Sequence, residues 1–555
     1  MNYSILIGGA AGQGMDTLAQ LLTKTLKRYG YFVFKHSDYM SRVRGGHNFI
    51  QIRFSDKQVR TYEDKVDIIY ALNKETIDLH SERLKEGGIV LVDKAVSDDE
   101  NLLLLDLEET AKEAGNKRAM TSVGMGAIIK LLGLEPDVAL NVIGSTLKDS
   151  IVDVNKEAFS KGYEMVGSRF GLKQEKDEKI LIDGNTAVAM GAAAAGCRYY
   201  CGYPMTPSTT VLSNMEKWSQ ELGIFTEQVE DEIAALNMAL GASYAGVRAM
   251  TGSSGGGIAL MSEALSLAGI IETPVVIINV QRPGPATGLP TRTEQADLRF
   301  AIHSGHGEFP KMVISLRSPE DAFYQTARAF NIAEKYQIPV ILLSDQYLAD
   351  GELSIEPFDF SKIEIERNLY EDELPAGRYK RYELTDTGIS PRIIPGKVEN
   401  KIILVDSDEH DEYGNITESA QMRTSMVDKR SKKGELLEGE VEEPWLIGDE
   451  NPDNLLVCWG SLFGQVNEVV EILQEEGHSV GALVYGDIYP FPTRLLKENA
   501  ATAKSIIDIE NNSAAQLDGL MREFALIKSD HKILKYDGRA FSVDELYNRL
   551  KEVVE

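Results

Sequence analysis

Polar side chains able to do chemistry stand where the chain changes from one expected element to the next. Thr206 lies between two prolines in Cys201-Gly-Tyr-Pro-Met-Thr-Pro-Ser208. Because proline fixes its own φ angle and favours an extended predecessor, this loop should present the threonine hydroxyl rigidly to a ligand. Carboxylates open a helical segment at Glu230-Asp-Glu232, and Arg282 and Arg292 follow an apolar run. The planar guanidinium of arginine can make two charge-assisted hydrogen bonds to a carboxylate.

Each of these residues also has an ordinary structural reading. Spacing does not separate the three acids at 230–232, because any of them could simply stabilise the first turn of a helix. Arg292 could form an ion pair with Glu294 or Asp297 and brace its own loop. The stretch Gly252-Ser-Ser-Gly-Gly-Gly257 has neither the G-x-S-x-G nucleophile pattern nor a P-loop pattern. We expect it to be a turn that allows a close backbone approach.

The segments that position these residues alternate between short apolar runs and helical patterns. Apolar runs of this kind are typical of strands buried on both faces. The expected strands are 247–251, 274–280, 311–316 and 339–344, and the expected helices are 184–196, 211–222, 230–241, 258–270 and 319–335. This alternation predicts a doubly wound α/β domain, in which ligands bind outside the carboxyl ends of the strands.

A second glycine-rich turn lies near the amino end, in Gly8-Gly-Ala-Ala-Gly-Gln-Gly14, between an expected strand and an expected helix. Its glycines follow G-x-x-G-x-G and not the dinucleotide-binding G-x-G-x-x-G, which argues against a nicotinamide-dependent dehydrogenase. The helix start at Gly12 and Gly14 could hold a phosphate, or the turn could be a connection without a ligand.

The chain of 555 residues is too long for one hydrophobic core. We expect an α/β domain at 1–173, a charged linker, a second α/β domain at 180–400, an irregular segment at 401–453 and a third α/β domain at 454–555.

Composition excludes several classes of function. A net charge of −28 argues against a nucleic-acid partner, because the phosphate backbone repels an acidic surface. No apolar run is long enough to span a bilayer, and the first residues lack the charged region of a signal peptide, so we expect a cytoplasmic protein.

Cysteine content limits the metal chemistry. An iron–sulfur cluster usually needs four cysteine ligands, and the chain has only Cys197, Cys201 and Cys458. We expect Cys197 and Cys201 to pack against small residues and the chain to contain no metal site. The acidic stretch Asp406–Glu412 could suit Mg²⁺ or Ca²⁺, but a solvated acidic loop is the simpler interpretation.

Several motifs resemble the alpha subunit of the 2-oxoacid:ferredoxin oxidoreductases, in the arrangement with a gamma-type domain fused in front. At the amino end, Arg42-Val-Arg-Gly-Gly-His47 is similar to the gamma domain. The most specific alpha-subunit motifs are Gly202–Ser208, Gly288–Asp297, Gly388–Pro395 and Asp408–Asn415. The resemblance covers nearly the whole chain. It implies a gamma-type α/β domain, a thiamine pyrimidine-binding doubly wound domain and a transketolase C-terminal-like α/β domain.

The same resemblance implies an activity. Members of the family oxidatively decarboxylate a 2-oxoacid with coenzyme A, which gives an acyl-CoA and CO₂, and they pass the electrons to ferredoxin in anaerobic metabolism. The Gly388–Pro395 segment and the fused gamma domain favour relatives that act on 2-oxoglutarate, with pyruvate and branched-chain acids left open. The alternative is a non-catalytic assembly or regulatory subunit that retains the fold.

The resemblance also implies a missing partner. The diphosphate signature of the family, Gly-Asp-Gly, occurs nowhere in this chain. We therefore expect a site shared with a beta subunit, which would carry Mg²⁺, the diphosphate of thiamine diphosphate and the iron–sulfur cluster. Activity would require both chains, assembled as a dimer of alpha–beta heterodimers.

Finally, the resemblance assigns roles. Glu232 corresponds to the acid beside the cofactor's aminopyrimidine, and the other cofactor contacts would be Tyr203, Pro204 and Ser253. Thr206 and Arg292 would complete the catalytic set. The substrate would be bound by Thr206, Arg282 and Arg292, with Arg292 favoured for the carboxylate, and coenzyme A by Gly12, Gly14, Arg42 and Arg44.

Overall fold

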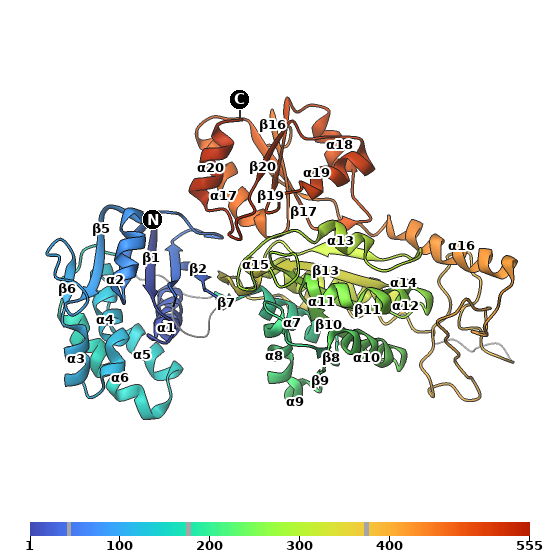
Figure 1. Ribbon diagram of the computed structural model, residues 1–555, viewed down its shortest axis with the longest axis horizontal. Coiled ribbons are helices and arrows are strands. Elements are labelled where there is room, and N and C mark those ends of the chain that lie inside the picture. The colour runs from blue at the N-terminus through green and yellow to red at the C-terminus, as the bar shows by residue number, and fades with distance from the viewer. Residues whose placement is uncertain (42–45, 174–178, 371–376, 555) are drawn as a thin grey trace. The chain divides into compact units, whose positions relative to one another are not determined.

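The computed structural model describes residues 1–41, 46–173, 179–370 and 377–554. The chain forms two compact units, which are treated separately here (Figure 1). The first unit consists of Met1–Ile182, Asp350–Pro357 and Ser542–Glu545, and the second of Asp183–Ala349, Phe358–Phe541 and Leu546–Glu555.

The first unit is built on an eight-stranded mixed sheet with the order β6-β5-β4-β1-β3-β2-β14-β7. Its strands are β1 (Asn2–Gly9), β2 (Phe32–Asp38), β3 (Asn48–Ser55), β4 (Val66–Ala71), β5 (Leu84–Asp93), β6 (Leu103–Leu105), β7 (Ile180–Ile182) and β14 (Glu352–Ile355). The strand β1 runs antiparallel to β3 and parallel to β4. The late strand β14 pairs with β2 and β7, so residues beyond 350 complete a sheet begun at the amino end.

Both faces of this sheet are buried, which explains its apolar strands. Ile5 and Ile7 of β1 point into the larger core with the helices, whereas Leu6 points into a smaller cluster on the other face. The helices of the unit are α1 (Met15–Arg28), α2 (Lys74–His80), α3 (Leu107–Glu113), α4 (Met120–Leu132), α5 (Asp137–Thr146) and α6 (Asp149–Glu164).

The glycine-rich turn before α1 is tight, as its sequence predicts. Gly12 and Gly14 have φ angles of 92° and 82°, a region that favours glycine, and Gly14 is the N-cap of α1. A Cβ atom added at Gly8 would lie 2.4 Å from the side chain of Thr76, so this strand end also requires glycine.

The second unit contains a seven-stranded sheet with the order β18-β12-β13-β11-β10-β8-β9. Its strands are β8 (Tyr199–Gly202), β9 (Phe225–Gln228), β10 (Ala249–Ser253), β11 (Val275–Gln281), β12 (Met312–Ser315), β13 (Pro339–Asp345) and β18 (Asp487–Tyr489). All pairs are parallel except that of β12 with β18. The carboxyl ends of six strands therefore meet at one edge.

Helices cover both faces of this sheet, as in a doubly wound fold. The helices are α7 (Gly184–Ala194), α8 (Thr209–Lys217), α9 (Ser219–Leu222), α10 (Glu232–Tyr244), α11 (Gly255–Leu260), α12 (Ser262–Ile270), α13 (Leu298–His303), α14 (Pro319–Tyr336) and α15 (Gln346–Asp350). Residues of α10 to α13 share one core with Val275 and Ile277 of β11. The helix α14 packs on α7, β11 and β13 but adds nothing to that core, so it covers the opposite face.

One expectation about this sheet was wrong. Gly255, Gly256 and Gly257 do not lie in a turn but form the first residues of α11, with Ser254 as the N-cap. Tertiary packing overrides the weak helix propensity of glycine here, and side chains at 255 and 257 would collide with the carboxylates of Asp297 and Glu232.

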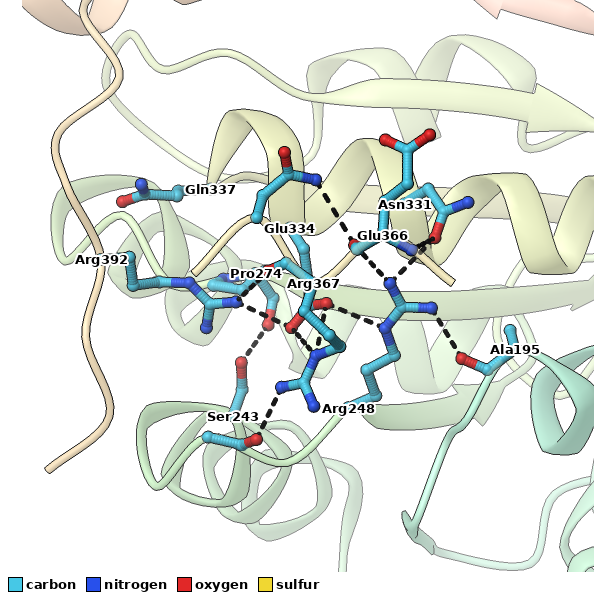
Figure 2. A network of polar contacts seen from close by, with 12 residues as sticks. Ala195, Ser243, Arg248, Pro274, Asn331, Glu334, Gln337, Glu366, Arg367 and Arg392 are labelled. Atoms are coloured by element: carbon cyan, nitrogen blue, oxygen red, sulfur yellow. Dashed lines mark hydrogen bonds and ion pairs between the residues drawn. The ribbon is translucent and has the colours of Figure 1, made fainter. Parts of the chain in front are cut away.

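A long irregular segment after β14 is tied to the sheet by a buried ionic network. Figure 2 shows the carboxylate of Glu334, on α14, at its centre. It accepts from Arg248 Nε at 2.9 Å, from Arg367 Nε at 2.8 Å and from Arg392 at 2.7 Å. Arg248 also donates to the carbonyl oxygen of Glu366 at 2.6 Å. These bonds hold Glu366, Arg367 and Arg392, which lie outside regular helices and strands, against α14.

The carboxyl-terminal part of the unit forms a five-stranded sheet with the order β15-β17-β16-β19-β20. Its strands are β15 (Trp445–Gly448), β16 (Asn454–Trp459), β17 (Val480–Tyr485), β19 (Ser505–Glu510) and β20 (His531–Leu534). The remaining helices are α16 (Ala420–Leu437), α17 (Phe463–Glu475), α18 (Arg494–Ala500), α19 (Gln516–Leu520) and α20 (Val543–Lys551). The helix α17 lies on one side of these strands and α18 and α19 on the other (Figure 1).

Candidate active site

The polar residues singled out in the sequence gather at the carboxyl edge of the seven-stranded sheet. The loop with Thr206 follows β8, Ser253 ends β10 and Arg282 follows β11. The strands β8, β10 and β11 are neighbours in the sheet, so their carboxyl ends are adjacent. This is the place where a doubly wound domain binds its ligands.

The structure separates three acids that are adjacent in the sequence. Glu230 is exposed. Asp231 is the N-cap of α10, and its carboxylate accepts the backbone N–H of Ala234 at 2.7 Å. Glu232 is 3% exposed and turns its carboxyl group into the protein. Only Glu232 is therefore a candidate for chemistry inside the domain.

The carboxyl group of Glu232 lies against the start of α11. The hydroxyl of Ser253 donates to its Oε1 at 3.3 Å. A Cβ atom at Gly257 would lie 2.0 Å from Ser253 Oγ and 2.6 Å from Glu232 Oε1. Glycine at 257 is thus required for the acid and the hydroxyl to meet. The sequence predicts that another group approaches the backbone of this stretch closely, and in the structure that group is the side chain of Glu232.

The loop after β8 borders the same place. Ser253 Oγ lies 3.6 Å from the sulfur of Met205. The guanidinium of Arg282 donates to the carbonyl oxygen of Thr206 at 2.5 Å, so it fixes this loop. Burial lowers the pKa of Arg282. The side chain of Thr206 is exposed, and Tyr203 is 41% exposed.

Arg292 lies on a separate loop between β11 and α13. The same loop brings Asp297 to Asn279, whose Nδ2 donates to Asp297 Oδ2 at 3.0 Å. A Cβ atom at Gly255 would lie 2.3 Å from that same carboxylate oxygen. The loop is therefore in contact with the start of α11 at Gly255, two residues before Gly257, which Glu232 contacts. Arg292 itself is half-buried.

Two carboxyl groups of this loop have unusual pKa values. Burial, and then the charge of Asp297, raise the pKa of Glu294 to about 6. Burial also raises the pKa of Asp297. The ion pair with Arg292 considered from the sequence would instead lower these values, so burial is the larger effect at both carboxyls.

Several buried polar atoms near this edge have no hydrogen-bond partner in the described parts of the chain. They include Ser254 Oγ, just before α11, and Asn279 Oδ1, near the end of β11. A buried polar group without a partner costs about 1–3 kcal/mol. The edge therefore retains hydrogen-bonding capacity that a bound molecule can use.

The candidate residues of the first unit are only partly described. Gly12 and Gly14 form the left-handed turn before α1. Arg42 and Arg44 lie outside the described residues.

The cysteines and the acidic stretch are used for packing and ion pairs. Burial raises the pKa of Cys197 and of Cys201 to about 12, and the thiol of Cys201 donates to the carbonyl oxygen of Ala235 at 2.9 Å. Glu409, in the acidic stretch, binds Arg423 at 2.5 Å and Arg430 at 2.8 Å. The stretch is therefore not simply a solvated loop, because two arginines neutralise its central carboxylate.

A polar cluster lies beside the candidate site, and the sequence points to only one of its two acids: Glu510, at a strand end, could contact a ligand or pack at an interface, whereas Asp345 was missed. Asp345, at the end of β13, accepts the hydroxyl of Ser461 at 2.5 Å and that of Thr293 at 3.3 Å. Glu510, at the end of β19, accepts the indole N–H of Trp459 at 3.0 Å. The signal was present, since both acids end apolar strands, where parallel sheets place their polar groups.

Three family models match successive parts of the chain. Residues 4–165 match the family described as pyruvate ferredoxin/flavodoxin oxidoreductase. Residues 190–429 match pyruvate flavodoxin/ferredoxin oxidoreductase, thiamine diphosphate-binding, and residues 452–546 match pyruvate:ferredoxin oxidoreductase core domain II. The three-domain α/β fold expected from the sequence is confirmed.

Relatives match over the full length. The chain is 34% identical to the 2-oxoacid:ferredoxin oxidoreductase subunit alpha of Sulfolobus sp, over 100% of this chain and 97% of the relative. It is 29% identical to the 2-oxoglutarate oxidoreductase subunit KorA of Mycobacterium tuberculosis, over 98% of this chain and 90% of the relative. Among solved structures, it matches the 2-oxoglutarate:ferredoxin oxidoreductase from Magnetococcus marinus, solved with 2-oxoglutarate, coenzyme A and succinyl-CoA bound. That match has a TM-score of 0.92 and 32% identity and covers 99% of both chains. The chain belongs to the 2-oxoacid:ferredoxin oxidoreductase family, as an alpha subunit with a gamma-type domain fused at its amino end.

Proposed function

We propose that this chain is the cofactor-activating subunit of an enzyme that oxidatively decarboxylates a 2-oxoacid, forms an acyl-CoA and CO₂, and passes electrons to ferredoxin. The observation that carries the proposal is the enclosed carboxyl group of Glu232 at the carboxyl edge of the sheet. It is buried, it receives the hydroxyl of Ser253, and it leaves no room for a side chain at Gly257. A carboxyl group in this setting suits a hydrogen bond to a ring nitrogen of a cofactor.

Thiamine diphosphate, when bound, supplies the carbanion-stabilising chemistry that cleavage beside a carbonyl group requires. Glu232 would hold the aminopyrimidine ring by a hydrogen bond, and Ser253 would orient the carboxyl group. The unpartnered oxygen atoms of Ser254 and Asn279 support a polar ligand at this edge.

The loops after β8 and β11 would hold the substrate. Arg292 would bind the carboxylate of the 2-oxoacid, and the exposed hydroxyl of Thr206 would donate to its carbonyl oxygen. Arg282 would line the substrate site between Arg292 and Thr206, because it already fixes the backbone of Thr206. Tyr203 and Pro204 would contact the cofactor from the same loop.

We propose 2-oxoglutarate as the substrate, ahead of pyruvate and branched-chain 2-oxoacids. The names of the M. tuberculosis relative and of the M. marinus structure, which is similar over nearly the whole chain, both include 2-oxoglutarate. The coenzyme A named with that structure supports coenzyme A as co-substrate here. We assign it to residues 1–173, through the turn at Gly12 and Gly14 together with Arg42 and Arg44. The cofactor would be held by residues 180–400, with 401–453 as a connecting segment and 454–555 as the third domain.

A partner chain is part of the proposal. The helix α10 is apolar nearly all round, and its outer face exposes Ile233 (47%) and Met238 (39%), close to the buried Glu232. An apolar surface of this kind marks a contact with another protein. We propose that a beta subunit covers it and brings Mg²⁺, the diphosphate site and an iron–sulfur cluster. The assembly would be a dimer of alpha–beta heterodimers.

The test is reduction of a viologen dye under anaerobic conditions by the chain alone and by the chain co-expressed with a candidate beta subunit. The substrates would be 2-oxoglutarate, pyruvate and a branched-chain 2-oxoacid, each with and without coenzyme A and thiamine diphosphate. We expect activity only in the pair, only with thiamine diphosphate, and highest with 2-oxoglutarate. A complete, cluster-loaded complex that reduces no dye with any 2-oxoacid would instead support a non-catalytic subunit.

A further inference from the structure

The loop that carries Arg292 is bound to the carboxyl-terminal sheet through its backbone. The N–H of Thr293 donates to the carbonyl oxygen of Gly538 at 3.2 Å, and the N–H of Gln295 donates to that of Asn511 at 2.8 Å. The amide of Gln516 donates to the carbonyl oxygen of Ala296 at 2.6 Å. Thr293, Gln295 and Ala296 of the loop are thus held by a part of the chain more than 200 residues later.

Two buried acids organise these contacts, and Asp345 is the first. It is 2% exposed, and its carboxylate accepts from Ser461 at 2.5 Å, from Thr293 at 3.3 Å and from the side-chain amide of Gln295 at 3.4 Å. Gln295 also donates to the carbonyl oxygen of Trp459 at 3.1 Å. Asp345 therefore joins the end of β13 to the loop and to the turn after β16.

Glu510 is the second acid, at the end of β19. Its carboxylate accepts from Trp459 at 3.0 Å, from the side chain of Asn512 at 2.7 Å and from the N–H of Leu517 at 2.7 Å. The same amide of Asn512 donates to the carbonyl oxygen of Gln295 at 3.0 Å. Glu510 thus orients Asn512, and Asn512 holds the loop.

The loop that these contacts hold also touches the candidate active site. Asp297 lies two residues after Gln295, and its N–H donates to the side chain of Gln281, at the end of β11, at 2.9 Å. Its carboxylate fills the space above Gly255, where a Cβ atom would lie 2.3 Å away. Arg292 lies three residues before Gln295. In the sequence, the anchored Gln295 therefore lies between Arg292, which is proposed to bind the substrate, and Asp297, which contacts the start of α11.

We propose that Asp345 and Asn512 are positioning residues for the reaction: they fix the loop 291–297, through Gln295, in the geometry in which Arg292 binds the substrate carboxylate. This inference rests on the proposed function and deepens it. Ordinary domain packing would use apolar contacts between the two sheets, and such contacts are present in the shared core. Packing alone does not require one buried carboxylate bound to the loop and a second that orients the amide of Asn512 towards it, because burial of a charge is costly unless it is hydrogen-bonded.

The variants that test this are Asp345→Asn and Asn512→Ala in the full chain, assembled with its partner. In Asp345→Asn an amide group faces the amide of Gln295, so that contact is lost while the shape is kept. Loss of one such hydrogen bond should raise the KM for the 2-oxoacid about tenfold. The KM for coenzyme A should stay within about twofold of the wild-type value.

A second measurement does not depend on activity. Hydrogen exchange at the backbone amides of Thr293 and Gln295 should be about tenfold faster in both variants. The matched control is Asp518→Asn. Asp518 is an equally buried acid of the same sheet region, but it binds Ser529, Arg522 and Lys532 and not the loop. Asp518→Asn should change neither the KM values nor the exchange rates of the Thr293 and Gln295 amides.

The proposal is overturned if exchange at these amides is unchanged in both variants. It is also overturned if exchange accelerates but the KM values for the 2-oxoacid and for coenzyme A rise equally. A wild-type complex that oxidises no 2-oxoacid would count against the proposed function, and exchange would still decide whether these residues hold the loop.

Discussion

At the scale of single residues, burial assigns different roles to groups of the same kind. Glu230, Asp231 and Glu232 are consecutive carboxylates, yet one is exposed, one caps a helix and one is enclosed beside Ser253. The two arginines near the site also differ. Arg282 is committed to the backbone of Thr206, whereas Arg292 lies on the loop that the third domain holds. These differences make Glu232 and Arg292 the residues to test.

Replacing Arg292 by alanine should weaken binding of the substrate carboxylate. The loss of a charge-assisted pair predicts that the KM for the 2-oxoacid rises about tenfold to a hundredfold, with the KM for coenzyme A nearly unchanged. Steady-state kinetics with each substrate varied in turn measures this split. Arg299→Ala, which removes an exposed partner of Glu523, is the control. Equal rises in both KM values would show that Arg292 only supports the fold.

Glu294 predicts a pH dependence. Its pKa is raised to about 6, so the side chain becomes negative as pH rises through 6. A negative charge two residues from Arg292 repels an anionic substrate, and the KM for the 2-oxoacid should therefore increase between pH 5 and pH 7. In Glu294→Gln this step should disappear from a plot of KM against pH. A step of unchanged size in the variant would assign the titration to another group.

At the scale of elements, buried ion pairs hold α16 against the sheet. Glu272, in the turn before β11, binds Lys429 Nζ at 2.6 Å and also pairs with Lys433. Burial alone would raise the pKa of Glu272, but the two lysines hold it well below its usual value. The stability that this acid contributes is complete above its unfolded pKa, near 4.5, and is lost as pH falls towards the native value.

Replacing Glu272 by glutamine should therefore leave the buried amino groups of Lys429 and Lys433 without their carboxylate partner. Breaking a buried pair in this way costs about 3–5 kcal/mol, and urea denaturation at pH 7 should measure that loss. The difference from wild type should shrink below about pH 4. Glu435→Gln, at an exposed position of α16, should have no such effect. If Glu272→Gln were as stable as the wild type at pH 7, the ion cluster would not be what holds α16.

The sequence predicts the helices and strands better than it predicts the contacts between them. The runs 274–280 and 339–344 appear as β11 and β13 with almost the expected bounds, because continuous apolar residues at strand length leave little alternative. The glycines at 255–257 were misplaced, since they begin a helix at a place where carboxylates from other segments leave no room for a side chain at 255 or 257. Asp345 and Glu510 could be recognised as polar strand ends, but Gln295, which Asp345 binds directly and Glu510 reaches through Asn512, lies far away in the sequence. Long-range pairing of this kind leaves no local pattern.

At the scale of the whole molecule, the candidate site contains the acid and the arginine but lacks the diphosphate signature of its family. Among the described residues, no group of three or more histidine, cysteine or carboxylate side chains is arranged to hold a metal ion. In the same parts of the chain, none of the helices combines the length and apolar character needed to cross a membrane. The exposed face of α10, beside Glu232, is the surface that we expect the partner chain to cover.

Charged residues on that face should prevent assembly. Ile233→Glu and Met238→Glu each place a carboxylate in the proposed interface, where burial of an unpaired charge is costly. Co-purification and light scattering should show loss of the complex while the chain itself stays folded. Leu526→Glu is the control, because Leu526 is 89% exposed and lies on a different element. A complex that forms normally with both α10 variants would place the partner elsewhere.

The most direct test of the account is the turnover of Glu232→Gln in the assembled, cofactor-loaded complex. Glutamine keeps the size of the side chain but cannot serve as the acid, so we expect 2-oxoacid-dependent dye reduction to fall at least about a hundredfold with the complex intact. Glu230→Gln, which changes the exposed acid of the same segment, should retain full activity. Near-normal turnover in Glu232→Gln would contradict the assignment of this residue and the proposed site built around it.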